Sequence, residues 1–149
     1  MLIREDFDIN VVLKQPLMAH LSTVEGAPRD SAVWFIWEES SAWIFGETSD
    51  SFVRRLTKEP RCALGVVDFD VQKGILKHVN IRGTAQILDP DRDRLTRFLI
   101  KYIGENKSDW NPWFIKNIVD PINCMVQVIP QSIVAKDLSF FKTGPQLAS

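Results

Sequence analysis

A hydroxyl-rich segment that leads into a basic stretch is the part of the sequence best suited to chemistry. Thr48, Ser49 and Ser51 come directly before a helix-forming stretch that carries Arg54 and Arg55. The free backbone N–H groups and the dipole at a helix start favour negative charge. The segment therefore predicts a site for an anionic group such as a phosphate.

Two aromatic-rich apolar runs precede this segment. They cover Ser31 to Trp37 and Ala42 to Phe45, and a short polar turn from Glu38 to Ser41 joins them. Aromatic residues favour strands, so the two runs predict a hairpin. A flat aromatic surface beside a helix start suits a ligand with both a planar ring and a phosphate. The hairpin tryptophans either line such a pocket or fill a barrel or dimer interface, and the sequence leaves both open.

Other catalytic signatures are missing from the sequence. It contains no P-loop and no Ser-His-Asp arrangement, which disfavours kinase and hydrolase chemistry. Cys62 and Cys124 form no CxxC pair and have no His at metal-ligand spacing, so we expect two buried thiols rather than a zinc site or a disulfide. No side chain is predicted as a general acid or a nucleophile.

Length and charge narrow the class of protein. With 149 residues the chain is expected to form one domain, 1–149, and a net charge of −1 argues against a general electrostatic grip on nucleic acid or membranes. The N-terminus carries charges where a signal peptide is apolar, and no run approaches the ~20 apolar residues of a membrane span. We therefore expect a cytoplasmic protein without nucleic-acid or membrane partners.

Periodicity and turn residues place the elements that must position these side chains. A long alternating strand contains Gly83, which suggests a bulge or a close backbone approach. Proline and capping residues mark the helix ends. Helices are expected at about Glu5 to Lys14, from Asp50 or Ser51 to Pro60, from Asp89 to Tyr102 and at Trp110 to Val119. Strands are expected at Leu17 to Thr23, Ser31 to Trp37, Ala42 to Phe45, Arg61 to Asp68, Ile75 to Leu88 and, around Pro130, Met125 to Ile129 and Ile133 to Ala135.

A set of about six strands cannot leave broad apolar faces open. A closed or partly closed barrel buries those faces and removes exposed strand edges. The predicted fold class is therefore mainly β, a six-stranded antiparallel split β-barrel with peripheral helices.

Four segments together resemble the pyridoxamine 5′-phosphate oxidase-like family of flavin-binding split barrels, in particular its general stress protein and flavin or deazaflavin reductase branches. They read LSTVEGAPRDSAVWFIWE, WIFGETSDSFVRRLTKEPRCAL, VNIRGTAQIL and MVQVIPQSIVAKD. The resemblance covers roughly Leu17 to Asp137. Their order and spacing, rather than any one segment, carry it.

The resemblance implies a homodimer with FMN at the subunit interface. It implies ring contacts and phosphate contacts from separate parts of the hairpin and the helix start, with Phe52 standing where the family has a phosphate-binding Lys. Arg54 or Arg55 is a candidate substitute for that Lys. His78 either donates a hydrogen bond to the ring or is a partly buried strand histidine. The implied ring contacts are Trp34, Phe35, Ile36, Phe45 and Gly46. The implied phosphate positions are Arg29 or its neighbour Asp30, Thr48, Ser49 and Ser51.

The function implied is electron transfer by bound FMN between a reduced nicotinamide and a small acceptor. FAD or the deazaflavin F420 is an alternative cofactor, and a non-enzymatic flavin carrier or stress-related module is an alternative function. The closing segment SIVAKDLSFFKTGPQLAS lacks the Arg-Leu-His-Asp-Arg-like motif of authentic pyridoxamine-phosphate oxidases. Oxidation of pyridoxamine phosphate itself is therefore not expected.

Overall fold

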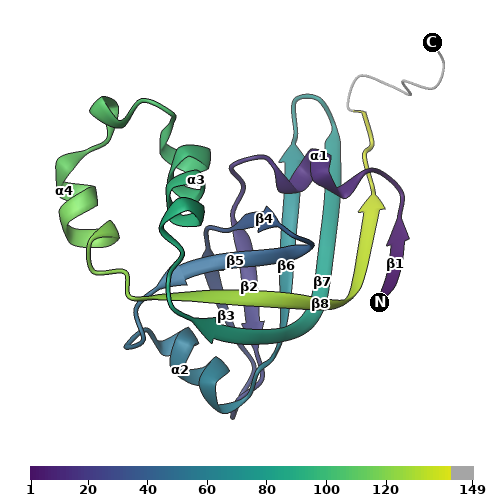
Figure 1. Cartoon of the computed structure of the whole chain (residues 1–149). Coiled ribbons are helices and arrows are strands. Elements are labelled where there is room, and N and C mark those ends of the chain that lie inside the picture. The colour runs from purple at the N-terminus through teal and green to yellow at the C-terminus, as the bar shows by residue number, and fades with distance from the viewer. Residues whose placement is uncertain (142–149) are drawn as a thin grey trace.

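Strands dominate the computed structural model, which describes residues 1–141 (Figure 1). One curled sheet follows the order β3-β2-β6-β7-β8-β5-β4, and β1 pairs in parallel with β8 outside this path. The strands are β1 (Leu2–Glu5), β2 (Ala19–Thr23), β3 (Arg29–Val33), β4 (Ile36–Glu38), β5 (Ser41–Gly46), β6 (Arg61–Asp70), β7 (Ile75–Leu88) and β8 (Cys124–Asp137). The sheet is an open half-barrel, consistent with a split barrel, but the prediction of six strands is wrong, because seven lie along the path.

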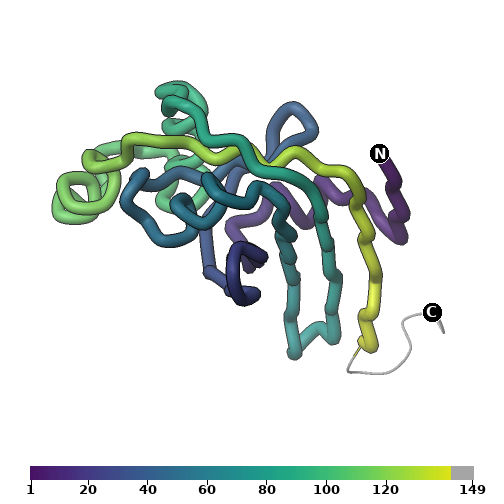
Figure 2. Tube along the Cα trace, turned by 90° about the horizontal axis from the view of Figure 1, so that it is seen from below, coloured from purple at the N-terminus to yellow at the C-terminus, as the bar shows by residue number. Residues whose placement is uncertain are grey.

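Helices close both ends of the curled sheet and cover one outer side (Figure 1). α1 and α2 contribute side chains such as Leu13 and Leu56 to the main core, whereas α3 packs a second apolar cluster against the other face of β5. The remaining helical turns project beyond α3 (Figure 2). The helical elements are α1 (Ile9–Leu13), α2 (Ser51–Lys58), α3 (Arg92–Ile103), a 3-10 turn (Lys107–Asp109), α4 (Pro112–Phe114) and a π-helical turn (Ile115–Val119).

The first helix is shorter than predicted. Asp8 caps it by accepting a hydrogen bond from the backbone N–H of Asn10, so α1 starts at Ile9 rather than near Glu5. The residues before the cap form β1, which pairs with Ser132–Ala135. This strand has only four residues, and its partner lies about 130 positions away. The local sequence therefore carries no pattern that predicts it.

The irregularity predicted at Gly83 is confirmed. The register between β7 and β8 shifts at Arg82/Gly83, opposite Pro130, which has no N–H to donate. A Cβ at Gly83 would lie 2.0 Å from the carbonyl oxygen of Ile129, so only glycine fits this approach. The two terminal strand segments predicted around Pro130 consequently form one long bent strand, β8.

The aromatic run from Ser31 to Trp37 is two strands rather than the one predicted. The strand is interrupted at Trp34 and Phe35, where side chains of α3 bind the backbone in place of a neighbouring strand. The backbone N–H of Phe35 donates to the Tyr102 hydroxyl at 3.1 Å, and Lys101 Nζ donates to the Phe35 carbonyl at 2.8 Å. These contacts satisfy the backbone N–H and carbonyl groups of Phe35.

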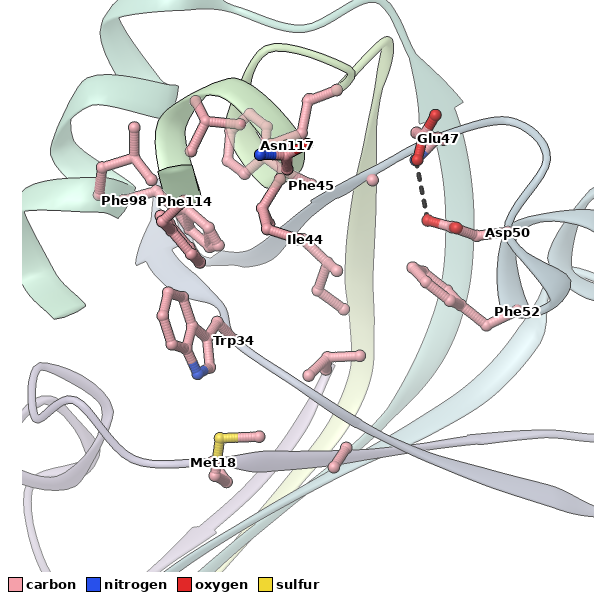
Figure 3. Close-up of a pocket in the computed structure, with 17 residues that line it drawn as sticks. Met18, Trp34, Ile44, Phe45, Glu47, Asp50, Phe52, Phe98, Phe114 and Asn117 are labelled. Carbon is pink, nitrogen blue, oxygen red and sulfur yellow. Dashed lines mark hydrogen bonds between the residues drawn. The ribbon is translucent and has the colours of Figure 1, made fainter. Parts of the chain in front are cut away.

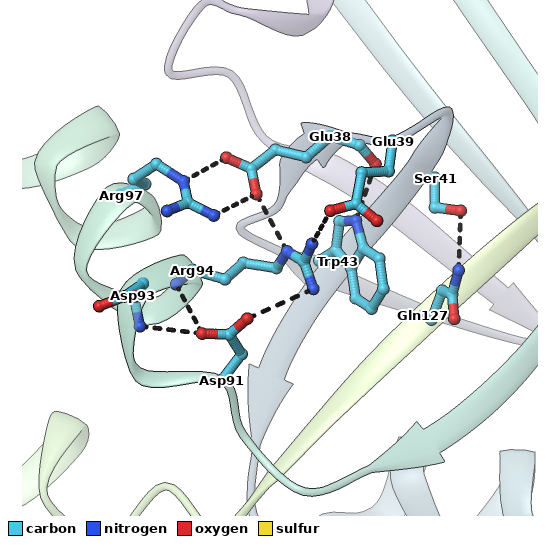
Figure 4. Close-up of polar contacts among 9 residues, drawn as sticks. All are labelled: Glu38, Glu39, Ser41, Trp43, Asp91, Asp93, Arg94, Arg97 and Gln127. Carbon is cyan, nitrogen blue, oxygen red and sulfur yellow. Dashed lines mark hydrogen bonds and ion pairs between the residues drawn. The ribbon is translucent and has the colours of Figure 1, made fainter.

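An ion-pair cluster joins α3 to the β4–β5 hairpin (Figure 4). The buried Arg94 guanidinium lies 3.7 Å from the Trp43 ring and donates to Glu38 at 3.0 Å and Glu39 at 2.8 Å. Hydrogen bonds from Arg97 and Arg94 lower the pKa of Glu38. The cluster fixes the hairpin although its turn residues Glu39 and Ser40 have φ angles of 53° and 54°, which glycine adopts more easily.

Among residues 1–141, no helix is both long enough and apolar enough to cross a bilayer. Both cysteines, Cys62 and Cys124, are buried and free, as predicted. Residues 142–149, which form part of the closing segment that lacks the substrate-binding motif, lie outside the described residues.

Candidate functional site

The split between β3 and β5 contains a pocket of about 420 Å³, which we call the aromatic pocket (Figure 3). β3 pairs only with β2, and the segment Ile44–Gly46 of β5 pairs only with β8, so two strand edges flank the opening. α2 begins at one end of the pocket, while α3 and the helical turns after it cover another. The lining side chains include Trp34, Phe45, Phe52, Phe98 and Phe114.

A network from α3 holds the central tryptophan of this pocket. The Trp34 ring stacks on Tyr102 with a centroid distance of 4.5 Å and an interplanar angle of 3°. The Tyr102 hydroxyl donates to the Leu17 carbonyl at 2.8 Å, and burial raises the pKa of Tyr102 to about 12. Tyr102 therefore stays a neutral donor at physiological pH. The stacked pair presents a preformed flat surface to the pocket.

The opposite end of the aromatic pocket is acidic (Figure 3). The Asp50 carboxylate accepts a hydrogen bond from the backbone N–H of Glu47 at 2.9 Å instead of capping α2. A Cβ at Gly46 would lie 2.7 Å from Asp50 Oδ2 and 3.3 Å from the Phe52 ring, so glycine allows this turn to close. The charged side chains that line this pocket, Glu47 and Asp50, are both acidic, so its charge disfavours an anionic group.

A second pocket, of about 830 Å³, lies along α2 and is basic; we call it the basic pocket. Arg55 is half-buried in it, with Nε donating to Thr23 Oγ1 at 2.8 Å and Nη2 donating to Ser31 Oγ at 3.3 Å. Neutral hydroxyls thus hold the guanidinium in place and leave its charge uncompensated. The charged lining residues are Arg29, Arg54, Arg55, Lys58 and a single carboxylate, Glu25.

The two pockets meet at the segment from Gly46 to Phe52. Side chains that alternate along this segment line one pocket or the other: Asp50 and Phe52 face the aromatic pocket, whereas Thr48 and Ser51 face the basic pocket. The first turn of α2 therefore contributes to both.

Most of the residues that the sequence assigned to a ring or a phosphate gather in these pockets. Four of them (Trp34, Phe45, Gly46 and Phe52) line the aromatic pocket, and four others (Arg29, Thr48, Ser51 and Arg55) line the basic pocket. Among the four residues in the aromatic pocket, Phe52 is the exception, since the sequence placed it at a phosphate position.

Four assigned residues lie elsewhere. Phe35 is fully buried and Ile36 is 9% exposed, so their side chains belong to the core, and Ser49 is exposed but lines neither pocket. His78 lies on the outward face of β7, in a separate pocket with Asn80 and Arg82. Within one chain, the structure does not bring these four to the two pockets.

Several lining residues were missed by sequence reasoning. Phe98 and Phe114 come from beyond residue 90, and no local pattern links them to the hairpin. Lys58, in contrast, carries a readable signal, because Ser51, Arg54, Arg55 and Lys58 follow the i, i+3, i+4, i+7 spacing of one helix face.

No protein-family model and no curated protein matches this sequence. Solved structures do match the fold. A conserved hypothetical protein from Mycobacterium tuberculosis has a TM-score of 0.72 at 17% identity, covering 98% of this chain and 96% of that one. An F420 reductase has a TM-score of 0.63 at 23% identity, covering 83% and 94%. General Stress Protein 26 from Bacillus anthracis has a TM-score of 0.62 at 14% identity, covering 89% and 95%.

At these identities the likeness establishes the fold alone. The predicted resemblance to split barrels of the general stress protein and deazaflavin reductase type is therefore supported at the level of architecture.

Proposed function

We propose that this protein binds a flavin-type cofactor, with the ring in the aromatic pocket and the anionic tail in the basic pocket. The observation that carries the proposal is the separation of the assigned residues into two adjoining pockets of matching chemistry. The structural likeness to an F420 reductase supports a cofactor of this class. FMN, FAD and F420 are the candidate cofactors.

The aromatic pocket fits a planar ring. Its volume of about 420 Å³ lies within the roughly 300–1,000 Å³ of small-molecule sites, and most of its lining is apolar. Trp34 stacks on Tyr102, and the hydrogen bond from the Tyr102 hydroxyl to the Leu17 carbonyl holds this pair in place. Ligand binding therefore loses little conformational entropy in ordering these side chains. Trp34, Phe98 and Phe114 would hold the ring and exclude water from it.

The basic pocket fits the tail. Its position beside the first turn of α2 adds the helix dipole to the side-chain charges, and Asp50 makes no side-chain cap to the helix. Arg55 would hold the anion from a fixed position. Thr48 and Ser51 would donate hydroxyl hydrogen bonds to it.

The activity we propose is electron transfer between a reduced nicotinamide and a small acceptor. A bound flavin supplies the redox chemistry, while the protein binds the ring, orients it and keeps water away. A non-enzymatic flavin carrier is a second candidate, favoured by the absence of His, Lys, Arg or Tyr from the described lining of the aromatic pocket. Reduction kinetics with NADH and NADPH separate the two, because a carrier is reduced no faster than free flavin.

We further propose a homodimer formed through the outward face of β6, β7 and β8. Along β6 this face carries Ala63, Gly65, Val67 and Phe69, of which Val67 is 43% and Phe69 58% exposed. Uncovered apolar side chains on a sheet face are typical of an interface. His78 lies on the same face beside Gly65 and would approach the partner's site. Sedimentation should give twice the mass of one chain; a monomer at micromolar concentration contradicts this proposal.

Spectroscopy of the purified protein tests flavin binding. Titration with riboflavin, FMN, FAD and F420 should shift the absorbance of at least one of them with a micromolar Kd. Trp34→Leu should weaken binding about tenfold, because it removes a stacked ring of a kind worth about 0.5–1.5 kcal/mol beyond its buried area. Trp113→Leu is the matched control, since Trp113 is 64% exposed and lines neither pocket. If none of the four ligands binds, the proposal fails.

A further inference from the structure

One face of α2 forms a continuous basic stripe. Ser51, Arg54, Arg55 and Lys58 occupy positions i, i+3, i+4 and i+7 and all line the basic pocket. At about 1.5 Å rise per residue, the stripe runs roughly 10 Å from Ser51 to Lys58. A hydrogen bond or ion pair spans only about 3 Å. The two ends of the stripe are therefore spaced for more than one anionic group.

Three acidic residues that are close in sequence to the lining of the basic pocket, but outside it, are engaged by other groups. Glu59 binds Arg61 at 2.9 Å, which lowers the pKa of Glu59, and Asp30 binds His20 at 2.9 Å. Asp50 accepts from the Glu47 backbone on the side of the aromatic pocket. Among residues 1–141, no carboxylate forms an ion pair with the four cations of the basic pocket.

The resulting charge is strongly uneven. Four cations and one carboxylate line the basic pocket of a chain whose net charge is −1. Concentrated charge of one sign in a concave site attracts ligands of the opposite sign. A monoester phosphate concentrates its charge, at most about two negative charges near neutral pH, on one group, whereas two linked anionic groups distribute charge along the row of cations.

We infer that the basic pocket takes a tail with two or more anionic groups, such as a pyrophosphate, rather than a single phosphate. The inference rests on the proposed function for the position of the ring, and it deepens that function by naming the class of cofactor tail. Arg55 and Ser51 bind the anionic group nearest the ring, and Arg54 and Lys58 bind the group beyond it. FAD and F420 are the two sources of such a tail among the candidate cofactors.

Inorganic anions test the pocket without any flavin. Calorimetry on ligand-free protein at low salt should give tripolyphosphate at least about tenfold tighter binding than orthophosphate. The double variant Arg54→Gln/Lys58→Gln should weaken tripolyphosphate about threefold or more and leave orthophosphate nearly unchanged. Arg92→Gln is the matched control, because Arg92 is exposed on α3 and lies outside the pocket. Equal binding of the two anions, or an equal loss in the control, overturns the inference.

Cofactors give the second arm of the test. FAD or F420 should bind at least about fivefold tighter than FMN, and the double variant should reduce this advantage while FMN binding stays the same. A preference for FAD identifies a pyrophosphate tail, and a preference for F420 identifies the tail of the deazaflavin. Equal binding of FMN, FAD and F420 overturns the inference while the proposed function stands. If no flavin binds but tripolyphosphate does, the proposed function fails and the polyanion site stands.

Discussion

Arg55 is the residue whose substitution most sharply separates binding of the tail from binding of the ring. It is held by Thr23 and Ser31 rather than by a carboxylate, and it lines the basic pocket only. Arg55→Met keeps most of the apolar stem and removes the charge. The variant should therefore weaken FMN binding and leave riboflavin, which has no phosphate, almost unaffected.

The size of the effect follows from the contacts. A hydrogen bond to a charged group contributes about 1.5–3 kcal/mol, so FMN should bind roughly 10- to 150-fold more weakly. The substitution also lowers the stability of the fold. Thr23 is fully buried, and its hydroxyl loses the hydrogen bond that Arg55 donates to it. An unsatisfied buried group costs about 1–3 kcal/mol of unfolding free energy.

Flavin fluorescence titration measures the first effect and urea unfolding the second. Thr23→Val is the matched control, since it removes the Arg55–Thr23 hydrogen bond but keeps the charge. It should cost stability with a smaller loss of FMN affinity than Arg55→Met. Equal losses of FMN and riboflavin affinity in Arg55→Met would refute the assignment of the tail to the basic pocket.

Three further predictions concern the scaffold. Arg94→Met should lower the unfolding free energy, measured in urea, by about 2–4 kcal/mol, because Glu38 keeps only Arg97 as a partner. A decrease below about 1 kcal/mol would contradict a structural role for the cluster. Ser40→Gly should raise stability by about 1 kcal/mol, since Ser40 has a φ of 54°, and an unchanged melting temperature would argue against backbone strain there. Burial lowers the pKa of Lys101 to about 8 from 10.5, so the folded state loses this proton before the unfolded chain does and stability rises with pH above about 8. Relative to Lys101→Met, the wild-type unfolding free energy should therefore rise by about 1 kcal/mol between about pH 7.5 and 9.5, allowing for partial exposure, whereas a flat difference would contradict this.

Local signals predicted the elements that depend on local chemistry. The segment from Asp89 to Asp91 indicated the start of α3, and the structure places the cap at Asp91, whose side chain accepts from the backbone N–H groups of Asp93 and Arg94. Gly83 marked the irregularity in β7 because a side chain there cannot fit. In each case the residue type itself signals the feature: an aspartate can cap a helix, and a glycine allows a close backbone approach.

Features that depend on distant contacts escaped prediction. The break at Phe35 exists because Lys101 and Tyr102, more than 60 positions away, bind its backbone. Phe98 is also far in sequence from the hairpin residues of the aromatic pocket, so its contribution was not predicted. Phe52 was assigned to a phosphate position by resemblance, yet its side chain faces the aromatic pocket, because neighbouring residues of the first turn of α2 point to different sides.

A crystal structure of the protein with FAD bound would locate both the ring and the tail of the cofactor. We predict the isoalloxazine ring in the aromatic pocket beside Trp34 and the pyrophosphate along α2 between Arg55 and Lys58. A ring bound outside the opening between β3 and β5, or a pyrophosphate away from α2, would contradict it.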